Sequence, residues 1–176
     1  VYLEGYHRPE GTSTDDPVYD AIADVLSGGR TSRLYRSLVR DKKIAAQAGA
    51  FNGFPGTKYP GLMVMRAVPT PGHTNEEVQA AIREQLERLK TEPITDEELK
   101  QVKTRAKADL IRGLDDNQGI ASQLAFYQAR YGDWREMFKT VERLDKVTKE
   151  DVMRVANATF VATNRTVGMI ENADAA

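Results

Sequence analysis

The sequence predicts an α+β fold, with a largely antiparallel sheet and several helices packed on one face. Strand-like and helix-like patterns come in clusters along the chain rather than in strict alternation, which is the order that segregates helices to one side of a sheet. The length of 176 residues fits one domain, and a chain of this size buries roughly two thirds of its unfolded surface without needing a disulfide or a metal. We predict a single domain over residues 1–171 and a frayed tail at 172–176.

The first part of the chain predicts a strand followed by two helices. Residues 1–7 alternate as a strand does, and a turn-rich segment follows. Asp16 before Pro17 predicts a helix start, with a carboxylate cap and proline at the first helical position. Gly28 and Gly29 end that helix, and a second one is expected over 32–41. The residues expected to face inward are Val18, Ile22, Val25, Leu26, Leu34, Leu38 and Val39.

Three further strands are predicted in the middle and at the end of the chain. Residues 44–51 and 61–68 form an expected antiparallel pair joined by a glycine- and proline-containing loop. The second of these is almost entirely apolar, as a strand buried on both faces would be. Residues 163–170 are expected to close the fold as a last strand.

The helices between those strands begin at strong capping signals. Thr74 with Glu77, and Thr95 with Glu98, have the spacing of a capping box, in which two side chains satisfy free N–H groups at the helix start. Apolar residues at helical spacing follow each box. Further helices are expected over 117–131, 134–144 and 148–160, and the first of these should end near Gly132.

Composition excludes several classes of function. The chain has 25 basic and 26 acidic residues, interspersed, so nothing favours nucleic acid or an anionic membrane as partner. It has no cysteine, which excludes disulfides, thiolate zinc sites and cysteine nucleophiles. No apolar run reaches the roughly 20 residues that span a bilayer. Because the chain begins in a strand-like pattern without a methionine, we expect it to be a piece of a longer protein.

Residues that could do chemistry are scarce. A catalytic zinc needs three protein ligands, but the two histidines, His7 and His73, have no metal-ligating neighbour at helical spacing. The serines lack the G-x-S-x-G pattern of an exposed nucleophile. Gly28-Gly29-Arg30 could cradle an anion at a helix start, although a helix stop followed by a helix start explains it better. We therefore predict no catalytic residue and no metal ligand in this chain.

One segment is identified as similar to a known family. Leu26-Ser-Gly-Gly-Arg-Thr-Ser-Arg-Leu-Tyr-Arg-Ser-Leu38 resembles the L-x-G-G-x-S-S-R-L-Y-x-x-L signature of insulinase/pitrilysin (M16) peptidase domains. The likeness extends over most of the chain. Five later segments resemble family passages in the same order: Pro93 to Leu99, Asp115 to Ala121, Tyr131 to Asp133, Val147 to Val152 and Asn164 to Val167.

The resemblance implies the carboxy-terminal, non-zinc-binding domain of an M16 zinc peptidase, of the M16B type, with the LuxS–MPP-like fold of one half. Such proteins have two homologous halves that enclose a peptide in a chamber. The zinc belongs to the amino-terminal half, which carries H-x-x-E-H, and nothing in this sequence matches that motif. The implied partners are that zinc-binding half of the same chain and a peptide substrate. The implied compartment is bacterial, periplasm or cytoplasm, with the periplasm favoured.

The family's second half also offers an arginine and a tyrosine to the substrate, and this chain departs from that pattern. The matching stretch runs from Leu38 to Ala46. In the ungapped register Val39 and Ala46 take the two positions, and a slip of one residue places Arg40 and Gln47 there. Arg40 and Gln47 are therefore the candidate substrate-binding residues, although Arg40 also fits as an exposed arginine that complements a helix end.

The missing tyrosine leaves three alternatives open. The chain can be an enzyme module whose arginine–tyrosine pair lies on a second M16 subunit. It can instead come from a non-catalytic partner or scaffold subunit of M16 type, or be a generic α+β binding domain, since fold does not fix function. An upstream H-x-x-E-H motif would favour the enzyme. On its own, the fragment is expected to be inactive.

Overall fold

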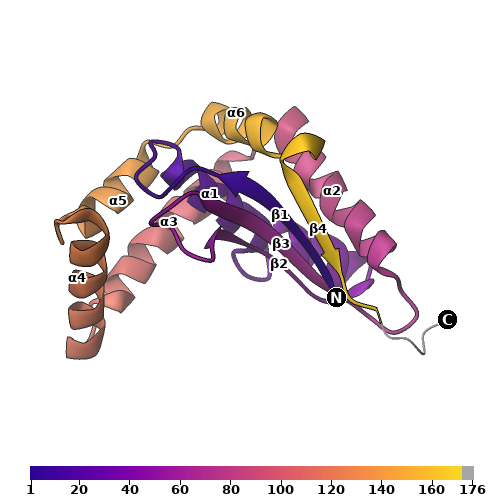
Figure 1. Ribbon diagram of the computed structural model, residues 1–176, viewed down its shortest axis with the longest axis horizontal. Coiled ribbons are helices and arrows are strands. Elements are labelled where there is room, and N and C mark those ends of the chain that lie inside the picture. Colours follow the sequence, from indigo (N-terminus) through magenta and orange to yellow (C-terminus); the bar gives the residue numbers. More distant parts are fainter. Residues whose placement is uncertain (172–176) are drawn as a thin grey trace.

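The computed structural model describes residues 1–171 as a four-stranded antiparallel sheet with helices on one face (Figure 1). The strands are β1 (Tyr2–Arg8), β2 (Ala45–Phe54), β3 (Gly61–Pro69) and β4 (Arg165–Met169). The helices are α1 (Asp16–Ser27), the π-helix η1 (Tyr35–Asp41), α2 (Asn75–Thr91), α3 (Asp96–Gly113), α4 (Asn117–Tyr131), α5 (Glu136–Asp145), α6 (Lys149–Thr159) and the short 3-10 turn η2 (Ala162–Asn164). This architecture confirms the predicted α+β class. The predicted tail at 172–176 lies outside the described residues.

The two inner strands of the sheet are β3 and β1, in the order β2-β3-β1-β4. All three neighbouring pairs are antiparallel, and Glu4 of β1 lies opposite Met65 on one side and Val167 on the other. Successive side chains of a strand point to opposite faces. One face of the sheet is therefore built from residues in register with Glu4, and α1, α2 and α6 pack over that side.

A single cluster of buried apolar side chains fills the space between the sheet and these helices. Burial of each large aliphatic side chain stabilises the fold by about 1.5–3 kcal/mol. We call the sheet with α1, η1, α2 and α6 the body of the molecule. Its buried residues include Tyr2, Tyr6, Ile22, Leu26, Leu34, Leu38, Met63, Met65, Ile82, Leu89 and Val155.

Both predicted capping boxes are present. Thr74 and Thr95 accept hydrogen bonds from the N–H groups of Glu77 and Glu98, whose carboxylates accept in return from the capping residues' own N–H groups. A third box joins Thr148 and Asp151 at the start of α6. Each such cap contributes about 1 kcal/mol, so the helix starts are fixed by local sequence.

Three local predictions were wrong in part. The prediction of a β3 buried on both faces is wrong in part, because on the face without helices Val64 is buried, but Leu62 and Val68 are only half-buried and Arg66 is exposed. Helix α1 has Asp15 as its N-cap without a side-chain bond, because the Asp16 carboxylate accepts instead from Arg8 Nη2 at 2.6 Å. The second helix is present over 33–41, within one residue of the prediction, but it is wound mainly as the π-helix η1, and Val39 on it is only half-buried.

A second region, which we call the arm, consists of the carboxy-terminal half of α3 together with α4 and α5. It projects away from the sheet at one end of the molecule (Figure 1). Helix α4 has no buried residue along its 15 positions. It ends as predicted at Gly132, whose φ of 75° is the left-handed conformation that glycine adopts without strain. No helix among residues 1–171 is long and apolar enough to cross a membrane.

Candidate functional surface

The described residues contain no group of three or more side chains that could hold a metal ion. His7 is exposed on β1. His73 precedes α2, where its Nδ1 lies 2.9 Å from the Glu77 carboxylate that also completes the capping box. The two histidines thus lie on separate elements with different neighbours, and the side chains present do not fit a catalytic zinc.

The two candidate substrate-binding residues come from adjacent elements but share no contact. Arg40 lies near the end of η1, half-exposed, and forms a paired hydrogen bond with its neighbour Asp41 at 2.6 and 3.1 Å. This bond raises the pKa of the Arg40 guanidinium above its ordinary value. Gln47 lies on β2, where its Oε1 accepts from Arg66 Nη1 at 3.2 Å. Of the ungapped alternatives, Val39 is half-buried and Ala46 is exposed.

The largest candidate surface is the face of the sheet that no helix of the described chain covers. Along each strand, the residues out of register with Glu4 point to this side. We call it the open face. Its side chains are apolar, small or polar, with Arg66 as the one permanent cation, and no Asp or Glu of the four strands lies on it. Its residues are Leu3, Gly5 and His7 of β1, Gln47, Gly49, Phe51 and Phe54 of β2, Leu62, Val64, Arg66 and Val68 of β3, and Thr166 and Gly168 of β4.

Sequence reasoning missed this surface, although the alternation of residues along β1 and β2 was a partial signal. Leu3, Phe51 and Arg66 are all exposed here. Alternation along β1 and β2 separates inward from outward residues, but it does not say on which side the helices pack. The apolar character of the open face even suggested that β3 was buried on both sides.

The opposite, helix-covered face holds a buried carboxylate. Glu4 is fully buried and accepts hydrogen bonds from the hydroxyls of Tyr2 and Tyr6. Arg83 of α2 and Arg165 of β4 lie 3.4 and 3.7 Å from its Oε1. Burial, and then the bond to Glu4, raise the pKa of Tyr2 to about 12. Because a buried carboxylate needs such partners to be tolerated, we assign this cluster to structure rather than to chemistry.

An ionic cluster ties the arm to the body. The fully buried Arg8 pairs with Asp16, and Arg130 of α4 reaches the same carboxylate at 3.6 Å. The Arg130 guanidinium passes over Gly11, where an added Cβ would lie 1.4 Å from its Nη2. The neighbouring Tyr131 hydroxyl donates to the Gly11 carbonyl at 3.3 Å. These contacts anchor the carboxy-terminal end of α4 and no other part of it.

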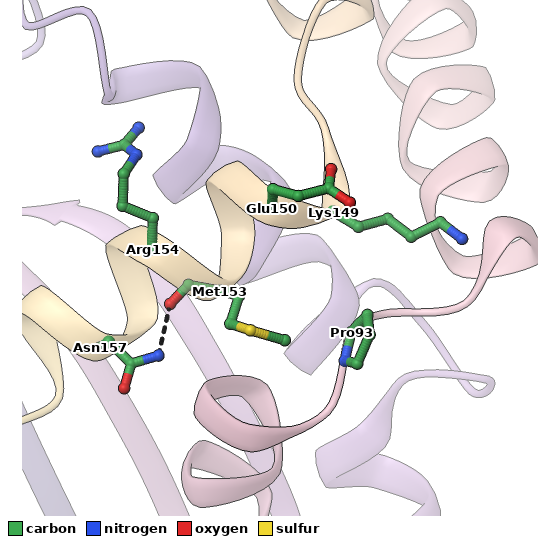
Figure 2. Close-up of a pocket in the computed structure, with 6 residues that line it drawn as sticks. All are labelled: Pro93, Lys149, Glu150, Met153, Arg154 and Asn157. Atoms are coloured by element: carbon green, nitrogen blue, oxygen red, sulfur yellow. Dashed lines mark hydrogen bonds between the residues drawn. The ribbon is translucent and has the colours of Figure 1, made fainter.

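Three shallow grooves cross the helical side, and none has the geometry of an active site. The first, of about 330 Å³, lies on α6 (Figure 2). Met153 points toward Pro93, whereas Lys149 and Arg154 point away from them. Those two cations are already paired, at 2.6 Å with Asp96 and at 2.7 Å with Asp15. The lining adds one carboxylate, Glu150, but no base or nucleophile beside it, so the groove holds no catalytic pair.

The second groove, of about 520 Å³, runs between η1, α2 and α3 and is lined by charged side chains. Arg33 forms two bonds to Glu98 at 2.7 and 2.9 Å, and Lys42 pairs with Glu84 at 2.5 Å. A third, of about 370 Å³, lies over α3 beside Asp145. Here Lys107 pairs with Asp145 at 2.7 Å. In the last two grooves, opposite charges neutralise each other within the chain.

Comparison with known proteins gives the family. Residues 3–106, more than half of the chain, match the family described as the Peptidase M16 inactive domain. The chain belongs to this family, whose members are the carboxy-terminal type of M16 domain. The fold agrees with that membership.

Curated relatives are named as zinc proteases. The chain is 30% identical over 170 residues to the zinc protease PqqE of Helicobacter pylori, covering 94% of this chain and 38% of that protein. It is 28% identical over 133 residues to an uncharacterised zinc protease of Mycobacterium leprae, covering 75% of this chain and 29% of that protein. The chain thus spans well under half the length of these relatives.

Solved structures show the same fold. A protease from Helicobacter pylori superposes with a TM-score of 0.87 at 29% identity, over 94% of this chain and 40% of that chain. An inactive peptidase domain from Bordetella parapertussis superposes with a TM-score of 0.83, also at 29% identity, over 95% of this chain and 89% of that chain. In the second match, this chain covers most of a solved structure that consists of an inactive peptidase domain.

Proposed function

We propose that this chain is the inactive carboxy-terminal half of a zinc metallopeptidase, in which it forms half the wall of a chamber that encloses a peptide. The observation that carries the proposal is the pair of uncovered surfaces, the open face and the arm, on a domain with a complete core of its own. A helix without any buried residue, beside a sheet with one bare face, is what an unpartnered half would present.

The open face suits contact with a peptide backbone. An added Cβ on Gly168 would meet nothing within 4 Å, so an extended chain can approach β4 closely, whereas the space over Gly5 and Gly49 is taken by Leu62 and Ser27. Arg66 and His7 add cationic or polar groups at its surface, and no strand carboxylate opposes them. Neutral and acidic peptides are therefore the substrates that this wall favours on charge grounds.

The arm suits contact with the other half of the protein. Its exposed large side chains include Ile120 and Phe126 on α4 and Trp134 and Phe138 near α5. Arg130 lies over the rings of Phe126 and Tyr131, and Arg135 over that of Trp134. Aromatic residues and arginine are the types enriched where proteins bind one another. We infer that the zinc-bearing half covers this surface.

The proposed roles of the two halves differ because the described side chains of this chain do not fit a zinc ion. Zinc, held by the other half, would act as a Lewis acid and activate water for hydrolysis. The side chains described here do not fit the metal, so no step of the reaction passes through them. This half contributes binding surface and excludes bulk water from the enclosed peptide, which strengthens electrostatic interactions at the reacting bond.

Arg40 and Gln47 remain the proposed substrate contacts at one end of the open face. Gln47 lies on that face, and Arg40 precedes it at the end of η1. Because Arg40 is held by Asp41, it must exchange that partner to bind a substrate. Arg40→Ala in the complete enzyme should raise KM severalfold and leave kcat nearly unchanged, whereas Lys42→Ala, its exposed neighbour, should change neither constant.

A second candidate function follows from the missing tyrosine, whose position falls to Ala46 or, after a slip of one residue, to Gln47. A non-catalytic M16 partner or scaffold subunit has no need of that hydroxyl. A subunit whose arginine and tyrosine are supplied by a second M16 subunit also has no need of it. The two cases differ in zinc content, because only the second belongs to a chain that holds the metal.

The test compares this chain with the full-length gene product. Bound zinc is measured by mass spectrometry and hydrolysis with a quenched fluorescent peptide library, for each protein alone and after addition of a purified M16 partner. We expect zinc and cleavage only with the full-length protein. Zinc-free full-length protein would replace the peptidase proposal with the scaffold. Stoichiometric zinc in the isolated chain would contradict both.

A further inference from the structure

The two edges of the sheet differ in how they are protected. Along the β2 edge lies α1, where Asp20 accepts from Asn52 at 2.8 Å. A Cβ on Gly49 would also lie 3.1 Å from the Ser27 hydroxyl of the same helix. No helix lies along the β4 edge in the described chain, and only Asn75 of α2 reaches its end, donating to the Ile170 carbonyl at 3.3 Å and to Glu171 at 3.5 Å. Every residue from Thr166 to Met169 is exposed, and a Cβ on Gly168 would meet nothing within 4 Å.

The hydrogen bonds of β1 show which backbone groups of β4 are free. Val1 and Ile170 exchange both of their hydrogen bonds, at 2.7 and 2.9 Å. In an antiparallel pair, such pairs alternate with pairs that exchange none. Gly168 and Thr166, opposite Leu3 and Gly5, therefore also point their N–H and C=O groups toward β1. Val167 and Met169 point theirs toward the free edge, where residues 1–171 offer no partner.

An exposed edge strand is a template for another strand, and the usual protections are weak here. From Thr166 to Ile170 the strand carries no charge and no proline. Val167, Met169 and Ile170 are all exposed apolar residues. The only charges are Arg165 at one end and Glu171 at the other.

We propose that the β4 edge pairs with β4 of a second copy of this chain, antiparallel, about a two-fold axis through Gly168. In this register Val167 lies opposite the partner copy's Met169, and both present free N–H and C=O groups to each other. Arg165 lies opposite the partner copy's Glu171, so opposite charges face each other at both ends. The result is a continuous sheet made from the strands of both copies.

Charge complementarity selects this register and this occupant. Moving the axis to Val167 also matches the free backbone groups, but it places Arg165 opposite Met169 and leaves Glu171 without a partner. Arg165 lies 3.7 Å from the buried Glu4 and keeps 27% of its side chain exposed, so it remains available to a second carboxylate. An isologous contact of this kind closes as a dimer and does not propagate.

The test uses a single introduced cysteine, because the chain has none of its own. At Gly168 the two copies would form a non-hydrogen-bonded pair with Cα atoms about 4.5 Å apart, which is within disulfide range. Gly168→Cys should therefore form a covalent dimer under mild oxidation, in high yield. The matched control is Thr166→Cys, whose two copies would lie about 13 Å apart along the strands and should stay reduced.

A second, non-covalent measurement keeps the proposal testable if oxidation fails. Light scattering of the unmodified chain should show a mass that rises toward twice the monomer's with concentration. Val167→Lys, at an exposed edge position, should abolish the rise without changing the circular dichroism spectrum. A monomer at every concentration, with the Gly168→Cys variant left reduced, would overturn the proposal and leave the edge to another segment or peptide. A disulfide-linked dimer of the Thr166→Cys variant instead would overturn the register.

Discussion

The body and the arm of this molecule are built on opposite principles. In the body, α2 alone buries seven residues, and its apolar stripe packs against the sheet. In the arm, the similarly long α4 buries none. Both helices begin at a capped residue, Thr74 and Asp116. Local sequence therefore forms both helices equally well, but only the body gives its helix a surface to cover.

This difference separates the residues that stabilise the fold from those that remain available to bind a partner. Helices of this length gain most of their stability from tertiary packing rather than from propensity. Within the arm, α5 buries Met137 and Leu144, but α4 keeps its exposed aromatic residues without that packing. We infer that it is held for a partner, so substitutions of the same kind should affect the two regions differently.

The largest effect is expected in the body. Ile82 of α2 is fully buried, so Ile82→Ala should lower the free energy of unfolding by about 4 kcal/mol, because it leaves a cavity in a close-packed core. Ile120→Ala makes the same change on α4, where the side chain is exposed, and should cost less than about 0.5 kcal/mol. Urea unfolding followed by circular dichroism measures both. Equal losses would remove the distinction between body and arm.

The next effect is expected at the junction. Asp16→Asn leaves the buried Arg8 without its counter-ion and releases Arg130. Removing one partner of a buried pair costs about 3 kcal/mol. Amide hydrogen exchange should also quicken along α4 more than along α2, since Arg130 and Tyr131 are the contacts that anchor α4. Unchanged exchange on α4 would show that the arm is held by something else.

A smaller and pH-dependent effect is expected at Glu98. Burial alone would raise the pKa of its carboxyl, but the bonds from Arg33 and from the Thr95 N–H outweigh burial and hold it below the usual 4.5. A lowered pKa in the folded state contributes stability above the unfolded value, which is lost as pH falls through the folded one. Glu98→Gln should therefore cost about 1.5 kcal/mol at neutral pH.

That cost should shrink as the solution is acidified below the usual carboxyl pKa of 4.5, where the wild-type carboxyl also becomes protonated. The measurement is urea unfolding of both proteins over a pH series. The control is Glu97→Gln, the adjacent carboxylate without an arginine partner, whose small effect should not follow this profile. A constant difference for Glu98→Gln at all pH values would contradict the assignment.

The smallest effect on stability should accompany a large effect on association. Phe126→Ser changes a half-exposed ring of the arm and should alter unfolding by less than about 0.5 kcal/mol. In the complete protein it should weaken the contact between the halves. Trp134, the chain's only tryptophan, provides the readout, since its fluorescence should shift to the blue when the other half covers it. The same shift with Phe126→Ser would place the contact elsewhere.

How much of this could be predicted from the sequence depends on the range of the interaction. The capping boxes at Thr74 and Thr95 and the end of α4 at Gly132 involve residues only a few positions apart, so the pattern predicts them directly. The pairing of Asp16 with Arg8, in place of a helix cap, cannot be predicted in this way, because Arg8 lies on the strand before the turn. Whether β3 is buried on one face or on both depends on where helices distant in the sequence pack.

The candidate site was harder to predict than the fold. Arg40 and Gln47 follow from resemblance alone, and the structure gives each a different partner, Asp41 and Arg66. The open face consists of ordinary strand residues without any catalytic signature, so no motif marks it. The exposure of α4 has no such signal either, because Ile120, Leu124, Tyr127 and Tyr131 follow at the spacing of a packed helical face.

The most direct test of the central claim is reconstitution from two separately purified parts, this chain and the amino-terminal remainder of the same gene product. Zinc content, peptide hydrolysis and Trp134 fluorescence are measured on each part and on the mixture. We predict that zinc is bound by the remainder alone, that hydrolysis needs both parts, and that Trp134 shifts on mixing. Full hydrolysis by the remainder alone, with no shift of Trp134, would contradict the assignment of this chain as half of the chamber.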